Sequence, residues 1–156
     1  MLGYWNNEKA TTEAIDQAGW MHTGDLAVMD VGGYINIAGR IKDMILRGGE
    51  NIYPREIEEF LYTHDAIADV QVIGIPSEKY GEEVMAWVKT KTGSSLTEDE
   101  LFQFCNNKIA HYKIPKYWKF VDSFPMTITG KVRKVEMRET AIEELGLHAA
   151  AKIKTS

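Results

Sequence analysis

The sequence has little cysteine and no long apolar segment, and each shortage narrows the class of protein. Cys105 is the only cysteine among 156 residues, so no disulfide can form within the chain, which fits a reducing, cytoplasmic location. No stretch approaches the roughly 20 apolar residues that a membrane-spanning helix needs. Met1 is followed by Leu-Gly-Tyr-Trp-Asn-Asn, which is not typical of a signal peptide.

A strong excess of charge of one sign is also absent. The chain has 18 basic and 23 acidic residues, which gives a formal net charge of −5. This balance gives no basis for binding nucleic acid through bulk charge. The four histidines show no metal-binding spacing with one another or with Cys105, so no metal site is predicted. A composition of 44% apolar and 26% charged residues is ordinary for a globular protein.

The first forty residues contain one helical and two strand patterns. Residues 8–18 indicate a short helix that Gly19 ends. Residues 26–30 and 34–38 alternate around a Gly-Gly turn, which predicts a β-hairpin. Because two strands alone are marginally stable in water, we expect this hairpin to belong to a larger sheet.

Helical and strand patterns alternate after Lys42, and together they predict an α+β fold, a small subdomain with a short β-sheet flanked by helices. Pro54 suits the first turn of a helix, and Thr97-Glu-Asp-Glu100 is a capping box. Further strands are expected at 43–47, 68–76, 83–90 and 117–122, and a last helix at 134–145. We expect three parts: residues 1–40, the β-rich end of a larger N-terminal domain; residues 41–146, a C-terminal domain; and residues 147–156, a disordered tail.

Lys131 follows a turn of the sequence Thr-Ile-Thr-Gly. Gly130 permits a tight turn, and the threonines can hydrogen-bond the local backbone and stiffen it. A lysine at the tip of such a turn presents a compact charge with rotatable donors, which suits a phosphate or carboxylate oxygen. A solvated surface turn is the alternative interpretation of this motif taken alone.

Two upstream segments carry further polar candidates. Asp25 ends the segment Trp-Met-His-Thr-Gly-Asp, where its carboxylate can accept both hydroxyls of a ribose or cap its own turn. Arg40 follows Gly39, and its planar guanidinium suits a phosphate or ribose oxygen, or a surface ion pair. The second segment continues from Gly39 through Gly48-Gly49 to Glu58.

In this order and spacing, the three segments resemble the adenylate-forming superfamily: acyl-CoA synthetases, adenylation domains of peptide synthetases, and beetle luciferases. The resemblance runs from about Leu2 to about Glu144 and is strongest toward fatty-acyl-CoA synthetases of the medium- to long-chain type. The family's Ser/Thr/Gly-rich phosphate loop and its adenine-binding segment do not occur in this sequence. The resemblance therefore implies the C-terminal piece of such an enzyme.

The resemblance implies roles for the nucleotide-facing residues. Lys131 would supply the positive charge at the α-phosphate and the carboxylate while the adenylate forms. Asp25 would hold the ribose, and Arg40 would contact the nucleotide. Lys42 matches the hinge about which the C-terminal domain rotates between the two half-reactions.

The resemblance also implies a site for the thiol substrate. The turn at Gly48 and Gly49 would let the pantetheine arm of CoA pass, whereas Tyr112 and Lys116 would approach the CoA nucleotide. A solvated loop is the alternative for Tyr112 and Lys116. Asn51 stands where some relatives carry an arginine, and its role stays open.

The implied reaction has two steps: ATP and a carboxylate give an acyl-adenylate, and CoA then displaces AMP. ATP and Mg²⁺ would be bound mainly by an N-terminal domain that is also the chain's partner, and the fragment alone is expected to be inactive. The expected partners are a carboxylate, such as a fatty acid, and CoA, with no nucleic acid and no transmembrane segment; a homo-oligomer stays open. The alternatives are a carrier-loading adenylation domain, a non-catalytic module that binds CoA or a partner and, more remotely, a luciferase-like oxygenase.

Overall fold

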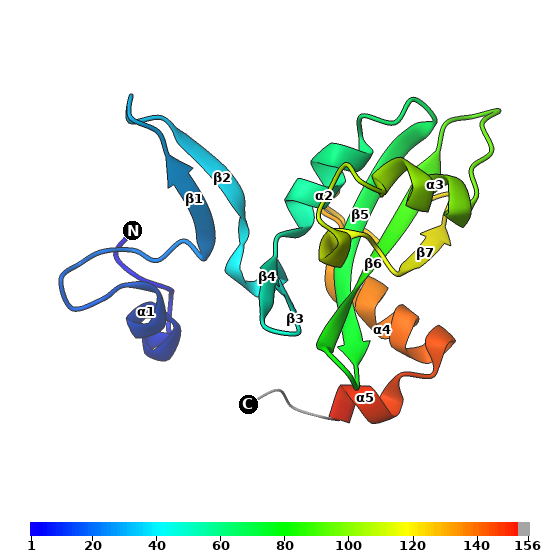
Figure 1. Ribbon diagram of the computed structural model, residues 1–156. Helices are drawn as coiled ribbons and strands as arrows, with labels where there is room; N and C mark the ends of the chain where they lie inside the picture. The colour runs from blue at the N-terminus through cyan, green and yellow to red at the C-terminus, as the bar shows by residue number, and fades with distance from the viewer. Residues whose placement is uncertain (153–156) are drawn as a thin grey trace. The chain divides into compact units, whose positions relative to one another are not determined.

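The computed structural model describes residues 1–152, and the chain divides into two compact units, Met1–Lys42 and Asp43–Ser156 (Figure 1). The last part of the expected tail, residues 153–156, lies outside the described residues. In residues 1–152 no helix is both long and apolar enough to cross a bilayer.

The first unit opens with helix α1, Glu8–Ala14, capped by Asn7, whose Oδ1 accepts the backbone N–H of Ala10 at 3.0 Å. The helix is shorter than predicted because Asp16 forms a turn. Its Oδ1 accepts the N–H groups of Ala18 and Trp20 at 3.0 and 2.9 Å. These bonds favour the ionised carboxylate, and the bond from Trp20 contributes most to lowering the pKa of Asp16.

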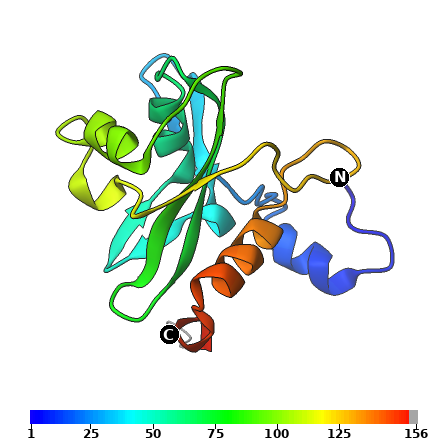
Figure 2. The ribbon, with the colours of Figure 1, turned by 90° about the vertical axis from the view of Figure 1, so that its right-hand side faces the viewer.

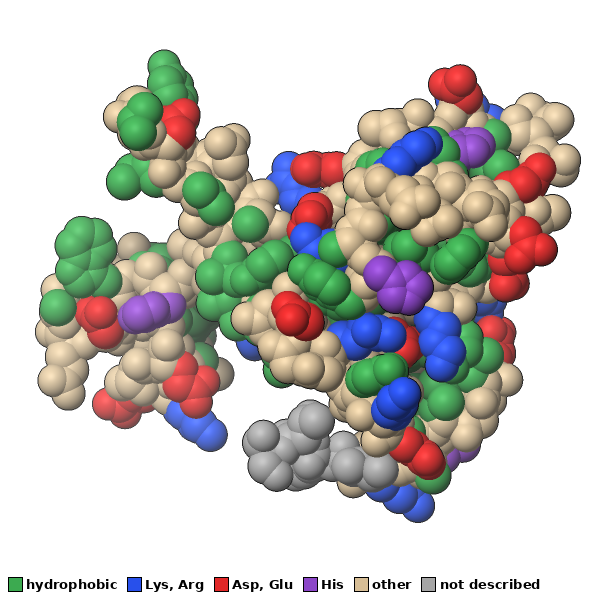
Figure 3. Space-filling view, in the orientation of Figure 1, with side chains coloured by type: hydrophobic (Ala, Val, Ile, Leu, Met, Phe, Trp, Pro, Cys, Tyr) green, Lys and Arg blue, Asp and Glu red, His purple; other side chains and the backbone are tan. Residues whose placement is uncertain are grey.

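The predicted hairpin is confirmed. Strands β1, Asp25–Met29, and β2, Ile35–Arg40, pair antiparallel with a bulge after Leu26. Asp30 closes the turn, since its Oδ1 accepts the N–H groups of Gly32 and Tyr34 at 2.8 and 3.0 Å. Several large apolar side chains of the hairpin are exposed, namely Val28, Met29, Val31, Tyr34 and Ile35. Hydrophobic side chains are green in Figure 3, and green atoms lie along the hairpin.

The second unit contains a five-stranded sheet in the order β4-β3-β6-β5, with β7 parallel to β6 (Figure 1). The strands are β3, Ile45–Arg47; β4, Glu50–Ile52; β5, Ile67–Ser77; β6, Gly81–Thr90; and β7, Tyr117–Phe120. Four of these strands match the predicted runs. Strand β4 was not predicted, because its short run Glu-Asn-Ile carries no alternating pattern.

Helices lie on both faces of this sheet, which confirms the α+β class (Figure 2). They are α2, Pro54–Leu61; α3, Glu98–Cys105; α4, Lys134–Leu145; and α5, His148–Lys152; with single 3₁₀ turns η1, Ile41–Asp43, and η2, His111–Lys113. Helices α2 and α3 share one apolar cluster with Val84, Ala86 and Val88 of β6. Helix α4 shares the other with Met85 and Trp87, because side chains alternate between the two faces of a strand.

Two helix ends test the sequence rules. The capping box is present: Thr97 Oγ1 accepts the Glu100 N–H at 3.2 Å, and Glu100 Oε2 accepts the Thr97 N–H at 2.8 Å. The expected disordered tail instead begins with helix α5. Alanines favour helix, and burial of Ala150 ties this helix to the unit.

Candidate functional site

Lys131 lies at the end of a tightly bonded turn. Thr127 donates its N–H to the Lys131 carbonyl at 2.8 Å, and its Oγ1 accepts the Lys131 N–H at 3.0 Å. Gly130 has φ +79°, a conformation that L side chains rarely adopt. The Lys131 side chain is exposed, so the turn presents a cation on a short, internally bonded support.

Gly48 and Gly49 form the turn between β3 and β4, with φ of +59° and +92°. The Gly48 N–H donates to the Tyr80 carbonyl at 2.8 Å, and a β-carbon at Gly48 would lie 3.2 Å from the Tyr80 ring. At Gly49 a β-carbon would meet nothing within 4 Å. The hydrogen bond from Gly48 to Tyr80 therefore holds the turn in place, while the space beside the Gly49 backbone stays open.

Asp25 and Arg40 are register partners at the open end of the β1–β2 hairpin in the first unit. Arg40 Nε lies 3.5 Å from Asp25 Oδ1, and the Asp25 side chain is half-buried while that of Arg40 is exposed. The structure thus brings together the two residues expected to bind the nucleotide. Lys42 lies in turn η1, at the last position of this unit.

Tyr112 and Lys116 have different surroundings. Tyr112 lies in turn η2 and packs against the apolar cluster of α2 and α3. Lys116 is exposed and lines a surface pocket of about 340 Å³ with Arg47 and His111, and the acidic residues Glu98 and Asp99 also line it. The pocket residues do not include Tyr112. Lys116 is therefore the better placed of the two to contact a ligand in this pocket.

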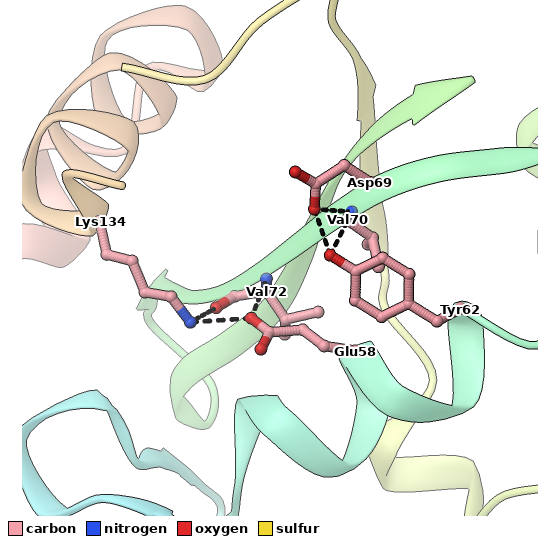
Figure 4. A network of polar contacts seen from close by, with 6 residues as sticks. All are labelled: Glu58, Tyr62, Asp69, Val70, Val72 and Lys134. Atoms are coloured by element: carbon pink, nitrogen blue, oxygen red, sulfur yellow. Dashed lines mark hydrogen bonds and ion pairs between the residues drawn. The ribbon is translucent and has the colours of Figure 1, made fainter. Parts of the chain in front are cut away.

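A polar network that the sequence did not indicate lies along β5 (Figure 4). Lys134 Nζ donates to Glu58 Oε1 at 2.8 Å and to the Val72 carbonyl at 3.0 Å, while Glu58 Oε1 accepts the Val72 N–H at 2.8 Å. Tyr62 donates its hydroxyl to Asp69 Oδ1. Burial, followed by that hydrogen bond, raises the pKa of Tyr62 to about 12.

A second set of polar contacts connects α4 to the strand that leads into the glycine turn. Arg138 Nη1 donates to the Gly74 carbonyl and to Glu82 Oε1, the latter at 2.7 Å. Glu82 Oε2 accepts the Leu46 N–H of β3 at 2.9 Å. One carboxylate of β6 thus joins α4 to β3. Arg47, the next residue of β3, forms a separate pair with Glu83.

A protein-family model described as the AMP-binding enzyme C-terminal domain matches residues 56–131. Over 150 residues the chain is 55% identical to YngI of Bacillus subtilis (strain 168), a protein named as an acyl-CoA synthetase. The chain belongs to the adenylate-forming, AMP-binding enzyme superfamily. The matched span includes Lys131, Tyr112 and Lys116.

Other members of the superfamily extend the match. The chain is 48% identical over 147 residues to the human mitochondrial medium-chain acyl-CoA ligase ACSF2. It superposes on ATP-bound MatB from Rhodopseudomonas palustris with a TM-score of 0.84 at 36% identity, covering 89% of this chain and 28% of that one. A fatty acyl CoA synthetase of Mycobacterium tuberculosis gives a TM-score of 0.69 at 39% identity, covering 91% and 28% of the two chains.

The chain spans about a quarter of the length of the curated adenylate-forming relatives it matches. It covers 27% of YngI and 24% of human ACSF2, although 96% and 94% of this chain takes part in those matches. The chain therefore spans only part of these relatives, and the family model that matches it describes a C-terminal domain, as its motifs indicated.

Proposed function

We propose that this chain serves as the C-terminal part of an AMP-forming acyl-CoA synthetase, an acid–thiol ligase. In the first half-reaction a carboxylate oxygen attacks the α-phosphorus of ATP and pyrophosphate leaves. In the second, the CoA thiol attacks the acyl carbonyl, loses its proton, and AMP leaves. The observation that carries this proposal is that one unit bears both an exposed lysine on a bonded turn and a bare glycine turn.

Lys131 suits the first half-reaction. Negative charge from the carboxylate and the phosphate comes together as the new P–O bond forms, and a positioned cation stabilises that arrangement. A lysine ammonium can follow both oxygens because its three donors rotate. The two hydrogen bonds between Thr127 and the Lys131 backbone fix the position from which the Lys131 side chain extends.

The glycine turn suits the second half-reaction. A thiol at the end of a long arm needs a narrow path to the acyl carbonyl, and any side chain in that path would obstruct it. Gly49 offers backbone only, with no heavy atom within 4 Å of the place where a β-carbon would be. Lys116, which lines the neighbouring pocket with His111, would bind phosphate groups of CoA, and Tyr112 would anchor this segment by packing against the apolar cluster of α2 and α3.

The Asp25–Arg40 pair suits the nucleotide that both half-reactions share. The Asp25 carboxylate can accept two ribose hydroxyls while Arg40 meets a ribose or phosphate oxygen, and their 3.5 Å separation aligns them beforehand. Lys42, the last residue of the first unit, would be the hinge between an N-terminal part ending near residue 40 and a C-terminal domain over residues 41–146.

ATP and Mg²⁺ would be bound mainly by a preceding N-terminal domain. Residues 1–152 contain no group of three or more His, Cys, Asp or Glu side chains that could hold a metal ion, so we assign no Mg²⁺ ligand to them. The exposed apolar side chains of the β1–β2 hairpin support such a partner, since they would complete a larger sheet. Without that domain we expect the chain to be inactive.

The proposed substrate is a fatty acid. Support comes from the names of the relatives, which include a medium-chain acyl-CoA ligase and a fatty acyl CoA synthetase. The acyl pocket would lie in the N-terminal domain, so the residues of this chain do not select the length of the acyl chain.

The deciding experiment is acyl-CoA formation by the full-length protein with ATP, Mg²⁺, CoA and saturated carboxylates from acetate to palmitate. We expect AMP release that depends on CoA and is fastest with medium or long chains. Pyrophosphate exchange without an acyl-CoA product would instead favour a carrier-loading adenylation enzyme. Absence of both activities would favour a non-catalytic binding module.

A further inference from the structure

Helix α4 begins three residues after Lys131, so the position of its first turn sets the position of the Lys131 turn. The helix has no side-chain cap: its N-cap residue, Arg133, makes no capping hydrogen bond. Uncapped helix starts tend to fray, because their first N–H groups lack partners within the helix. Backbone contacts hold part of this end of α4, because the Arg133 N–H donates to the Pro125 carbonyl at 2.8 Å and Val132 forms a β-bridge with Met126.

Lys134, the first residue of α4, makes the side-chain contact that ties this end of the helix to α2 and β5 (Figure 4). Its ammonium bridges the Glu58 carboxylate of α2, at 2.8 Å, and the Val72 carbonyl of β5, at 3.0 Å. The Glu58 oxygen that accepts from Lys134 also accepts the Val72 N–H at 2.8 Å. The side chains are only 24% and 14% exposed, so water screens this pair less than a surface ion pair.

Arg138 adds a second contact one turn further along, on the same face of α4 because residues four apart align on a helix. It donates to the Gly74 carbonyl of β5 and to Glu82. Gly74 leaves room for this arrangement, since a β-carbon there would lie 3.2 Å from the Glu82 carboxylate and 3.1 Å from Ile45. Lys134 and Arg138 thus fix both the position and the direction of α4 along β5.

We propose that Lys134 is a positioning residue for Lys131. It acts through the start of α4: the Lys134–Glu58–Val72 triangle fixes the helix start, and the helix start fixes where the turn presents the Lys131 ammonium. This inference rests on the proposed function, in which Lys131 acts in adenylate formation only. Loss of the triangle should therefore slow one half-reaction and spare the other.

The size of the effect follows from the geometry that a charged catalytic group requires. A displacement of about 1 Å at such a group can cost up to about 100-fold in rate. Lys131 is retained in a Lys134→Met variant and would visit its working position part of the time. We expect a loss of about tenfold in the kcat of adenylation, with the KM values for ATP and carboxylate changed less than about twofold.

The experiment uses the full-length protein and measures the two half-reactions separately. Adenylation is followed by ATP–pyrophosphate exchange, and thioester formation by acyl-CoA release from supplied acyl-adenylate. Lys134→Met and Glu58→Gln should each slow adenylation and leave thioester formation unchanged. The double variant should be no slower than the worse single variant, because both remove the same bridge. Lys134→Arg should restore most of the rate.

Lys119→Met is the matched control. Lys119 pairs with Glu144 at the far end of the same helix, at 2.5 Å, and its side chain is 25% exposed, close to the 24% of Lys134. This variant removes the same charge and one α4 contact, but far from Lys131. We expect its adenylation rate to match the wild type within about twofold.

Three outcomes would overturn the proposal: full adenylation activity in Lys134→Met, equal losses in both half-reactions, or an equal loss in Lys119→Met. Failure of the proposed function is recognised separately, because the wild-type protein would then lack CoA-dependent AMP release. Hydrogen exchange gives a readout that does not depend on activity. The Lys131 amide, which donates to Thr127, should exchange faster in Lys134→Met than in Lys119→Met, and equal exchange would also contradict the proposal.

Discussion

Arg47 and Glu83 form a two-pronged ion pair across strands β3 and β6. Arg47 Nε donates to one Glu83 oxygen and Nη2 to the other at 3.3 Å, and the Glu83 side chain is 2% exposed. The Arg47 guanidinium also lies over the Tyr80 ring, 4.4 Å from its centre. A buried carboxylate with a single cationic partner depends on that partner for its stability.

Removing Arg47 should therefore destabilise the chain strongly. We expect Arg47→Met to lower the free energy of unfolding by about 3 kcal/mol, because it leaves a charge buried without a partner. The double change Arg47→Met with Glu83→Leu should lose less than Arg47→Met alone, since no buried charge remains. Urea denaturation of the three proteins measures both differences.

Arg55→Met is the control for this prediction. Arg55 pairs with Glu59 at 2.7 Å, but the side chains are 51% and 64% exposed. Exposed pairs contribute only about 0.5 kcal/mol, so this variant should unfold near the wild-type urea concentration. Similar losses in Arg47→Met and Arg55→Met would show that burial of Glu83 does not govern the effect.

Lys131→Ala should strongly slow adenylation in the full-length protein. A well-placed cation can contribute about 100-fold or more to a step in which charge develops. We expect pyrophosphate exchange to fall by at least about that factor, while acyl-CoA formation from supplied acyl-adenylate keeps its rate. Single-turnover assays of each half-reaction provide the measurement. Equal losses in both assays would refute the separation of roles.

Gly49→Ala and Gly93→Ala should separate backbone strain from function. The glycines have φ of +92° and +80°, and a β-carbon at either meets nothing within 4 Å. Each substitution should cost about 1–2 kcal/mol of stability through strain alone. Only Gly49→Ala should also slow thioester formation, because only its β-carbon enters the proposed thiol path. Urea denaturation and the thioester assay test this, and an equal rate in the two variants would argue against the path.

Stability should fall in acid partly through Glu100. The hydrogen bonds from the Thr97 backbone and hydroxyl lower the pKa of Glu100 below its ordinary value of 4.5. Because the folded-state pKa is the lower one, the carboxylate stabilises the fold above about pH 4.5, and this stabilisation is lost as the pH falls through the folded-state value. Glu100→Gln should therefore show a smaller loss of stability on acidification than the wild type.

Thermal or urea denaturation across this pH range measures that difference. Glu98→Gln removes a charge from the same first turn of α3 without touching the capping box, so it should keep the wild-type pH dependence. Thr97→Ala should cost about 1 kcal/mol near neutral pH through loss of the cap. A Glu100→Gln protein as sensitive to acid as the wild type would contradict the assignment.

Local patterns predicted most of the fold. The hairpin, the helix after Pro54 and the capping box at Thr97 all depend on residues within a few positions of one another. Strand β4 was missed because its three residues, Glu-Asn-Ile, are too few to show an alternation of polar and apolar side chains. Helix α5 was missed because its stability depends partly on burial of Ala150 against the rest of the unit.

The contacts around the candidate site were invisible for a different reason. Lys134 and Glu58 are 76 residues apart, and Arg138 and Glu82 are 56 apart. Spacing within the chain carries no signal for such pairs, because their meeting depends on how α4 crosses β5. The motif around Lys131 identified a candidate residue, but the groups that hold it could be found only from the fold.

Strand β5 lies at the end of the sheet, and its outward-facing backbone is bonded to side chains rather than to another strand. Glu58 and Asp69 accept the N–H groups of Val72 and Val70, while Lys134 donates to the Val72 carbonyl. An open strand edge is a template on which neighbouring molecules add strands. The bonds that orient α4 therefore also block the addition of strands to β5. A substitution that frees this edge would both displace α4 and expose the protein to self-association.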